Sequence, residues 1–102
     1  MCQTACFLYE EGDGMAFVYM LRCSDGSFYT GWTTHVQRRV LMHQAGKGAR
    51  YTRARLPVEL CYVEEVPDRS TALRRENAIK QMSHTKKEQL VQLSLSDGQS
   101  VL

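Results

Sequence analysis

A single carboxylate interrupts the apolar spacing of one predicted helix. Helical periodicity runs from Ser70, a suitable N-cap, to about Met82. The apolar side chains expected on the buried face of this helix are Ala72, Leu73, Ile79 and Met82. Glu76 falls on the same face, where a carboxylate is costly to bury unless it has a cationic partner or holds a metal ion. Glu76 is therefore a candidate metal ligand or acid–base group, with a structural ion pair to a nearby arginine as the alternative.

Arg39 and His43 stand four residues apart in another predicted helix, so their side chains project from the same side. An arginine beside a histidine suits a phosphate group and a proton transfer. The alternative is two polar residues on the surface of an amphipathic helix. Tyr19 and Tyr29 lie one on each strand of a predicted hairpin, where tyrosines ordinarily pack with the hydroxyl group in water. Taken singly, none of these residues decides a function.

Positive charge is concentrated in one segment of the chain. The protein has 13 Lys and Arg against 11 Asp and Glu, and none of the basic residues comes before Arg22. Six of them lie close together with no acidic residue between them: Arg38, Arg39, Lys47, Arg50, Arg53 and Arg55. Such a segment suits a polyanion such as DNA or RNA. The alternative is a solvated surface that happens to be basic.

The first elements that must position these residues follow from the apolar spacing. A β-hairpin is predicted from an apolar run at 16–21, turn residues at 24–27, and an aromatic and β-branched run at 28–33. The next helix is predicted to have Thr34 as its N-cap and to end at Gly46 or Gly48. Its buried face would carry Val36, Val40 and Leu41.

The second half of the chain adds one strand and two helices. A basic loop at 50–57 precedes a third strand at 58–66, and the helix that contains Glu76 follows. Thr85 and Glu88 form a possible capping box for a short third helix that ends near Leu93. The order β-β-α-β-α-α predicts an α/β fold with a small three-stranded antiparallel sheet flanked by helices.

The 102 residues are enough for one domain with one core. We predict a flexible N-terminal extension at 1–15, a domain at 16–94 and a C-terminal tail at 95–102. The sequence has neither an apolar run of about 18 residues for a membrane helix nor the pattern of a signal peptide, so we expect a cytoplasmic protein. No CxxC pair occurs, so Cys23 and Cys61 are expected to be free thiols in the core rather than zinc ligands.

Taken together, these residues resemble the GIY-YIG nuclease family, and most closely its small, single-domain bacterial members. The resemblance covers about residues 16–93 and rests on five positions at matching spacing: Tyr19, Tyr29, Arg39, His43 and Glu76. The stretch Gly46-Lys47-Gly48-Ala49-Arg50-Tyr51-Thr52-Arg53 is also similar to that branch. Both signature tripeptides depart from the family pattern, since they read Phe17-Val18-Tyr19 and Tyr29-Thr30-Gly31 here. The family's polar residue after the helix that carries the glutamate, often Asn, has no obvious counterpart here, and Lys80 or Lys86 is the nearest substitute.

The resemblance implies a metal-dependent endonuclease that hydrolyses phosphodiester bonds in DNA. Glu76 would hold a single divalent cation, Mg²⁺ or Mn²⁺, because one carboxylate suits an ion that keeps several waters. Arg39 would pair with a phosphate oxygen, and either Tyr19 or Tyr29 would orient or deprotonate the attacking water. His43 could then take the proton. No organic cofactor and no membrane partner are implied.

The same resemblance implies how nucleic acid would be held. The expected contact residues are Gly31, Lys47, Arg50, Arg53, Arg55 and Lys80. No further DNA-reading motif occurs in the sequence, so we expect selection of DNA shape, or delivery by a protein partner, with RNA left open. Relatives suggest a role in DNA repair or recombination. The alternatives are a non-catalytic nucleic-acid-binding module with the same fold, and an interaction protein whose acidic N-terminal segment binds a basic partner.

Overall fold

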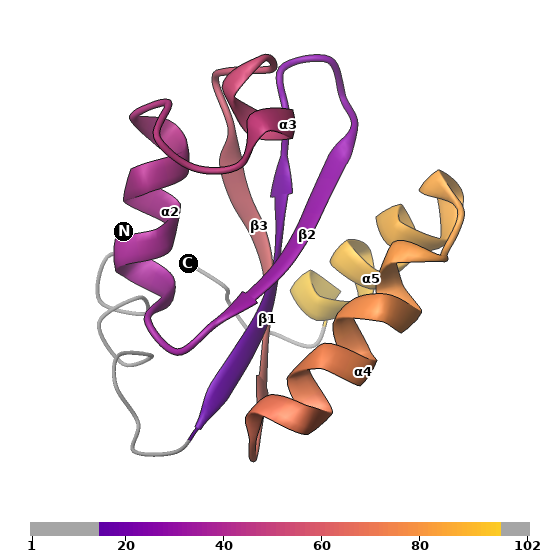
Figure 1. Ribbon diagram of the computed structural model, residues 1–102. Helices are drawn as coiled ribbons and strands as arrows, with labels where there is room; N and C mark the ends of the chain where they lie inside the picture. Colours follow the sequence, from indigo (N-terminus) through magenta and orange to yellow (C-terminus); the bar gives the residue numbers. More distant parts are fainter. Residues whose placement is uncertain (1–14, 97–102) are drawn as a thin grey trace.

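Three antiparallel strands form a sheet with helices on both faces (Figure 1). The computed structural model describes residues 15–96. The elements are β1 (Ala16–Arg22), β2 (Phe28–Thr33), α2 (Val36–Gln44), α3 (Arg50–Arg53), β3 (Glu59–Val66), α4 (Arg69–Lys80) and α5 (His84–Ser96). The strand order is β2-β1-β3. The predicted fold class and element order are confirmed, with α3 as an addition. Apart from residues 15, 95 and 96, the predicted extension and tail lie outside the described residues.

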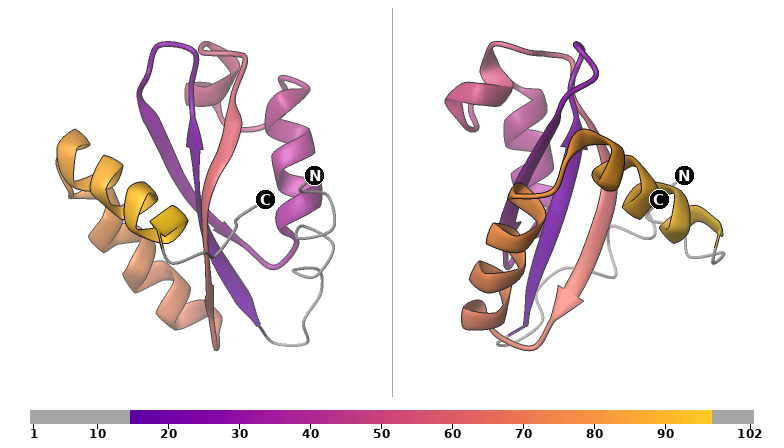
Figure 2. Two further views of the ribbon diagram at one scale, coloured as in Figure 1. Left: turned by 180° about the vertical axis from the view of Figure 1, so that it is seen from behind. Right: turned by 90° about the vertical axis from the view of Figure 1, so that its right-hand side faces the viewer.

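The central strand β1 is buried on both faces, which explains its uninterrupted apolar sequence. Phe17, Tyr19 and Leu21 pack into one core with Val36 and Val40 of α2. The alternate residues of β1 join a second core with side chains of α4 and α5: Ala16, Val18, Met20, Ala72, Ile79 and Val91. The views in Figure 2 show α2 and α3 over one face of the sheet and α4 and α5 over the other. The sheet therefore separates two small cores.

The first long helix, α2, differs from its prediction at both its start and its buried face. His35, not Thr34, occupies the N-cap, and its N–H donates to Oγ1 of Thr33 over 3.0 Å. The buried residues of α2 include Val36, Val40 and His43, whereas Leu41 is 58% exposed. The predicted apolar stripe was wrong at Leu41 because a histidine takes the third inward position.

Three other predictions need correction in the second half of the chain. The segment predicted as a basic loop contains one helical turn, α3, ahead of Pro57. Helix α4 begins after Asp68, whose carboxylate accepts the N–H of Thr71 over 2.7 Å, so Ser70 is not the cap. Leu73 is 47% exposed and does not belong to the buried stripe.

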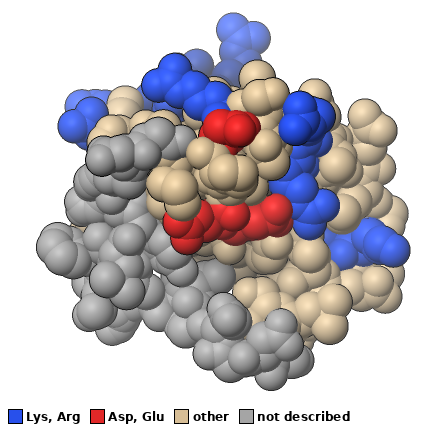
Figure 3. Space-filling view, turned by 90° about the horizontal axis from the view of Figure 1, so that it is seen from below, with Lys and Arg blue, Asp and Glu red and all other residues tan. Residues whose placement is uncertain are grey.

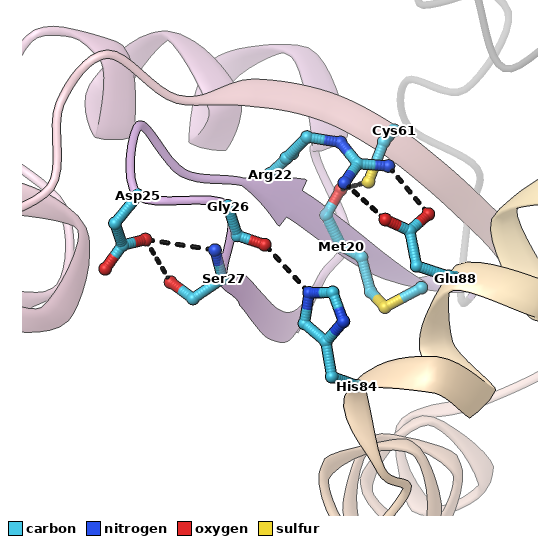
Figure 4. A network of polar contacts seen from close by, with 8 residues as sticks. All are labelled: Met20, Arg22, Asp25, Gly26, Ser27, Cys61, His84 and Glu88. Atoms are coloured by element: carbon cyan, nitrogen blue, oxygen red, sulfur yellow. Dashed lines mark hydrogen bonds and ion pairs between the residues drawn. The ribbon is translucent and has the colours of Figure 1, made fainter.

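Helix α5 is fastened to the hairpin by side chains from its first turns (Figure 4). Ser83 caps this helix by accepting the N–H of Lys86 over 3.1 Å, so the predicted capping box of Thr85 and Glu88 is wrong. Glu88 instead accepts two hydrogen bonds from the Arg22 guanidinium, at 2.8 and 3.1 Å. Nε2 of His84 donates to the carbonyl of Gly26 over 3.0 Å. Both contacts join the last helix to the hairpin formed by β1 and β2.

The two described cysteines are free thiols, as predicted. Cys23 is buried, and Cys61 is half-buried and packs against the core that faces α4 and α5. Burial raises the pKa of Cys61 to about 12, which keeps this thiol protonated at neutral pH. Within residues 15–96, none of the helices has the length and apolar character to cross a membrane.

Candidate active site

A chain of hydrogen bonds links β1, α2 and α3 inside the domain. The Tyr19 hydroxyl lies 2.9 Å from Nε2 of His43, and Nδ1 of the same ring lies 2.9 Å from Oγ1 of Thr52. Thr52 also lies 2.9 Å from the carbonyl oxygen of Ala49. The exposed fractions of Tyr19, His43 and Thr52 are 2%, 1% and 0%. These three polar groups are therefore held away from solvent by one another.

The Ala49 carbonyl fixes the direction of every bond in this chain. A carbonyl oxygen can only accept, so the Thr52 hydroxyl donates its hydrogen to Ala49. The Thr52 oxygen then accepts from Nδ1–H of His43, which leaves Nε2 of a neutral ring as the acceptor for the Tyr19 hydroxyl. The ring stays neutral because burial, and then the positive charge of Arg39, lower the pKa of His43.

Two glycines make room for these rings. A Cβ atom at Gly31 would lie 2.8 Å from the Tyr19 hydroxyl oxygen, and one at Gly48 would overlap the His43 ring. Both contacts are closer than a real Cβ atom tolerates. Glycine at position 31 therefore has a structural reason within the protein itself, because the Tyr19 hydroxyl lies against it.

The second tyrosine differs from the first in its surroundings. The Tyr29 ring is half-buried, and its centroid lies 5.0 Å from that of His43 and 6.4 Å from that of Tyr19. The pKa of Tyr19 is raised, first by burial and then by Tyr29, and Glu76 adds to the rise while Arg39 opposes it. Tyr19 therefore stays protonated, and Tyr29 is the more accessible of the two phenols.

Helix α4 carries the largely buried carboxylate of Glu76. Its side chain is 14% exposed and lies 3.4 Å from Nζ of Lys80. The expected alternative partner, an arginine, is replaced by this lysine. Among residues 15–96, no three His, Cys, Asp or Glu side chains converge where they could enclose a metal ion. One carboxylate of this kind fits an ion such as Mg²⁺, which retains several water ligands and shares phosphate oxygens.

Arg39 stands at the surface above the buried histidine. Its guanidinium has no hydrogen bond or ion pair with any described residue, although its charge lowers the pKa of both His43 and Tyr19. It borders a hollow of about 270 Å³ whose other lining residues are Thr33, Thr34, His35, Arg38 and Met42. An exposed arginine beside a neutral histidine can bind a phosphate oxygen.

The predicted nucleic-acid contacts fall into two groups. Lys47, Arg50 and Arg53 are exposed and have no acidic partner among the described residues. Arg55 instead lies 3.1 Å from Asp25 and covers the Tyr51 ring at 3.9 Å, and Lys80 pairs with Glu76. The face seen in Figure 3 carries acidic side chains among the basic ones, so positive charge does not cover the whole surface.

Sequence reasoning missed Thr52 and Gly48 as parts of this site. Both lie in the stretch from 46 to 53 that carried part of the family resemblance, but nothing in their spacing connects them with His43. Their roles become visible only when α3 folds back over α2.

A family model and several relatives match the chain over this whole region. The model of the GIY-YIG catalytic domain matches residues 15–89, which include every residue described above. The UPF0213 protein of Halobacterium salinarum is 55% identical over 76 residues, which cover 74% of this chain and 99% of the relative. The UPF0213 protein of Bacillus cereus is 50% identical over 74 residues, which cover 72% of this chain and 77% of the relative.

Two solved structures share the fold. The solution NMR structure of the UPF0213 protein from Bacillus halodurans is 49% identical, with a TM-score of 0.51, and the match covers 78% of this chain and 84% of the other. A protein from E. faecalis, also solved by NMR, is 38% identical with a TM-score of 0.57, and the match covers 82% and 88% of the two chains.

Proposed function

The chain belongs to the GIY-YIG nuclease family, and from this membership we propose that it is a divalent-metal-dependent endonuclease that hydrolyses phosphodiester bonds in DNA. The observation that carries the proposal is the buried hydrogen bond between Tyr19 of β1 and His43 of α2. The Glu76 side chain of α4 is only 14% exposed, and its charge contributes to the raised pKa of Tyr19. A domain that only binds nucleic acid needs neither a buried pair of proton-bearing groups nor a largely buried carboxylate.

Glu76 would hold the divalent metal, Mg²⁺ or Mn²⁺. When bound, such a metal supplies positive charge that activates water and neutralises the charge on the phosphate. The Lys80 ammonium that now lies 3.4 Å from Glu76 would have to move aside or stay as a second cation for the substrate. Arg39, whose guanidinium is exposed, would bind a non-bridging oxygen of the scissile phosphate.

Tyr29 is the phenol that would orient or deprotonate the attacking water. The Tyr19 hydroxyl donates its hydrogen to His43, and burial keeps the group protonated. Because Tyr19 is 2% exposed, it does not reach a water molecule in the solvent. Tyr29 lies beside both groups and reaches the surface. Tyr19 and His43 would then keep the water-activating tyrosine in place.

The substrate proposal is DNA recognised by its shape. Lys47, Arg50 and Arg53 offer exposed charges that grip a phosphate backbone without choosing a sequence. Flaps, nicks and branches differ from linear duplex in backbone course, which such contacts can distinguish. A cytoplasmic role in DNA repair or recombination, with delivery by a protein partner, completes the proposal.

A cleavage assay on labelled linear, nicked, flap and branched DNA, and on matching RNA, tests the function. Each substrate is incubated with Mg²⁺, Mn²⁺ or EDTA. We expect metal-dependent cuts that Glu76→Gln reduces at least about 100-fold, while Glu65→Gln, an exposed carboxylate of β3 without a described partner, leaves them unchanged. Salt-sensitive binding with no cuts on any substrate would favour the non-catalytic binding module instead.

A further inference from the structure

A groove runs across the outer edge of β2, next to the candidate active site. Its volume is about 360 Å³, and its lining residues are Phe28, Tyr29, Thr30, Tyr51, Lys80 and Lys87. Phe28 belongs to the core under α4 and α5, and Tyr29 packs against the core under α2. The groove therefore joins the two faces of the sheet at an edge strand, where no further strand covers it.

Tyr51 offers this groove an aromatic ring that is already fixed. The ring is 37% exposed, and the Arg55 guanidinium lies over it at 3.9 Å. Arg55 is itself anchored, because it donates to Asp25 and to the Tyr51 carbonyl, both at 3.1 Å. The Tyr29 ring lies 6.1 Å away at an angle of 32°. A ring held in this way can stack on a flat group with little loss of side-chain freedom.

Lys87 gives the groove an uncompensated positive charge. It is half-buried, and its side-chain ammonium has no hydrogen bond or ion pair with any residue of the described chain. Lys80, by contrast, is paired with Glu76 at 3.4 Å. The neighbouring Lys86 is exposed and does not line the groove. An anion that entered the groove would therefore meet Lys87.

Thr30 adds a polar atom to the floor of the groove. Its Oγ1 is buried and has no hydrogen-bond partner among residues 15–96. Buried hydroxyl groups are normally satisfied by a partner. The groove is thus lined by the aromatic ring of Tyr51, the unpaired ammonium of Lys87 and the unsatisfied hydroxyl of Thr30. This combination suits a ligand with a flat ring and a phosphate.

We propose that this groove binds one unpaired nucleotide of the substrate, with its base stacked on Tyr51 and its phosphate at Lys87. Inside a duplex both faces of each base are covered by neighbours, so away from the duplex ends only an unpaired nucleotide can offer a free face. The inference rests on the proposed nuclease function and makes its substrate class more specific. DNA that carries an unpaired nucleotide beside the cut, such as a flap, is the expected substrate.

The groove adjoins the reacting groups. Tyr29 lines the groove, and its ring centroid lies 5.0 Å from that of His43. Lys80 also lines the groove and forms an ion pair with Glu76. A nucleotide in the groove would therefore place the next phosphate of its strand near Glu76 and Tyr29. The unpaired nucleotide would be bound beside the scissile bond rather than at a remote part of the surface.

Binding assays in EDTA test this subsite without any cleavage. Labelled single strand, flap DNA and blunt duplex are titrated into the wild type and four variants: Tyr51→Leu, Tyr51→Phe, Lys87→Gln and Lys86→Gln. We expect Tyr51→Leu to weaken binding of flap and single strand about tenfold but not of duplex, and Tyr51→Phe to bind as the wild type. The logarithm of the binding constant for flap DNA falls linearly with the logarithm of the salt concentration, and Lys87→Gln should make this slope shallower by about 0.7. Lys86→Gln should change it by less.

Equal weakening of duplex and flap binding by Tyr51→Leu, or equal effects of Lys87→Gln and Lys86→Gln, would overturn the subsite. If Tyr51→Leu fails to fold by circular dichroism, the lysine pair decides alone, because Lys86 is exposed and Lys87 is only half-buried on α5. Selective loss of flap binding in a protein that cuts no DNA would uphold the subsite and refute the nuclease. If the protein cleaves DNA but its affinity for flap DNA is unchanged by all four substitutions, the subsite is refuted and the nuclease function is not.

Discussion

The hydroxyl of Thr52 donates its hydrogen to the Ala49 carbonyl, and this bond determines where the proton of His43 resides. Nδ1 must be the protonated nitrogen, because the Thr52 oxygen is free only to accept. Nε2 is then the acceptor that orients the Tyr19 hydroxyl. A residue without acid–base chemistry of its own thus controls two residues that have it.

Replacing Thr52 with valine should shift the His43 ring towards a mixture of its two neutral forms. Valine fills the same volume but cannot accept from Nδ1–H. Nitrogen chemical shifts of the histidine ring measure this directly, and we expect the proposed DNA cleavage to fall about tenfold. Thr52→Ser keeps the hydroxyl and should retain the wild-type nitrogen chemical shifts and cleavage rate. Identical nitrogen shifts of His43 in Thr52→Val and the wild type would contradict the inferred direction of the hydrogen bonds.

Stability should fall as the pH drops below the ordinary histidine pKa of 6.5, because the pKa of buried His43 is lowered. The unfolded chain then takes up a proton that the folded chain does not bind, with a slope of at most about 1.4 kcal/mol per pH unit. Urea unfolding at a series of pH values from 7.5 to 5 measures this slope. His43→Asn should remove this dependence of the unfolding free energy on pH, whereas His35→Asn, at an exposed position, should leave it unchanged. A pH dependence that remains in His43→Asn would belong to another group.

Residue type and spacing singled out several residues of the candidate site. Glu76 was predicted as a carboxylate among apolar positions; its side chain is 14% exposed, and its charge raises the pKa of Tyr19. His43, for which a position on the surface of an amphipathic helix was one of two alternatives, is 1% exposed and lies inside the core. Thr52 and Gly48 could not be predicted, since their function depends on a ring that another helix delivers.

Among the helices and strands, local signals placed the elements but not their faces. The hairpin was predictable because an apolar run and an aromatic, β-branched run flank a turn that contains a glycine, Gly26, whose φ is positive. The faces of α2 and α4 were wrong at Leu41 and Leu73, because buried polar residues compete with leucine for the inward positions. Tertiary contacts decide this competition, and periodicity alone cannot rank a buried histidine above a leucine.

Helix boundaries were missed where several capping residues stand together. Asp68 and Ser70 both suit an N-cap, and so do Ser83 and Thr85. In each pair the structure uses the earlier residue, so each helix begins two residues sooner than predicted. The sequence offers both residues of each pair and does not rank them.

Removing the Glu88 carboxylate should loosen α5 from the hairpin. Glu88→Ala abolishes both hydrogen bonds to Arg22, whose guanidinium also lies 4.8 Å from the centroid of the Phe28 ring. We expect faster hydrogen exchange of the amides in α5, with those of α2 unchanged. Glu65→Ala, on an exposed carboxylate of β3, is the matched control. Unchanged exchange in α5 would show that apolar packing alone holds this helix.

The whole molecule is built as one sheet with a core on each face. Each core is small, so each apolar side chain carries a large share of the stability of a domain that is worth roughly 5–15 kcal/mol in total. The two cores share β1, whose side chains alternate between them. Loss of packing on one face therefore affects the sheet that the other face needs.

Ile79→Ala should lower the free energy of unfolding by about 3 kcal/mol. Its side chain is fully buried where α4 packs on the sheet, and the truncation leaves a cavity. Leu73→Ala removes a similar side chain from the exposed side of the same helix and should cost less than about 1 kcal/mol. Urea unfolding of both variants measures the difference, and equal losses would refute the described orientation of α4.

The position of Glu76 late in the chain has a consequence for synthesis on the ribosome. Strand β1, the hairpin and the basic segment around α3 leave the ribosome first, while the carboxylate arrives on α4 after β3 has completed the sheet. On the proposed chemistry, a half-made chain can touch nucleic acid but lacks the group that would cut it. The order of synthesis would thus keep the nascent chain inactive until α4 and α5 have packed on the sheet.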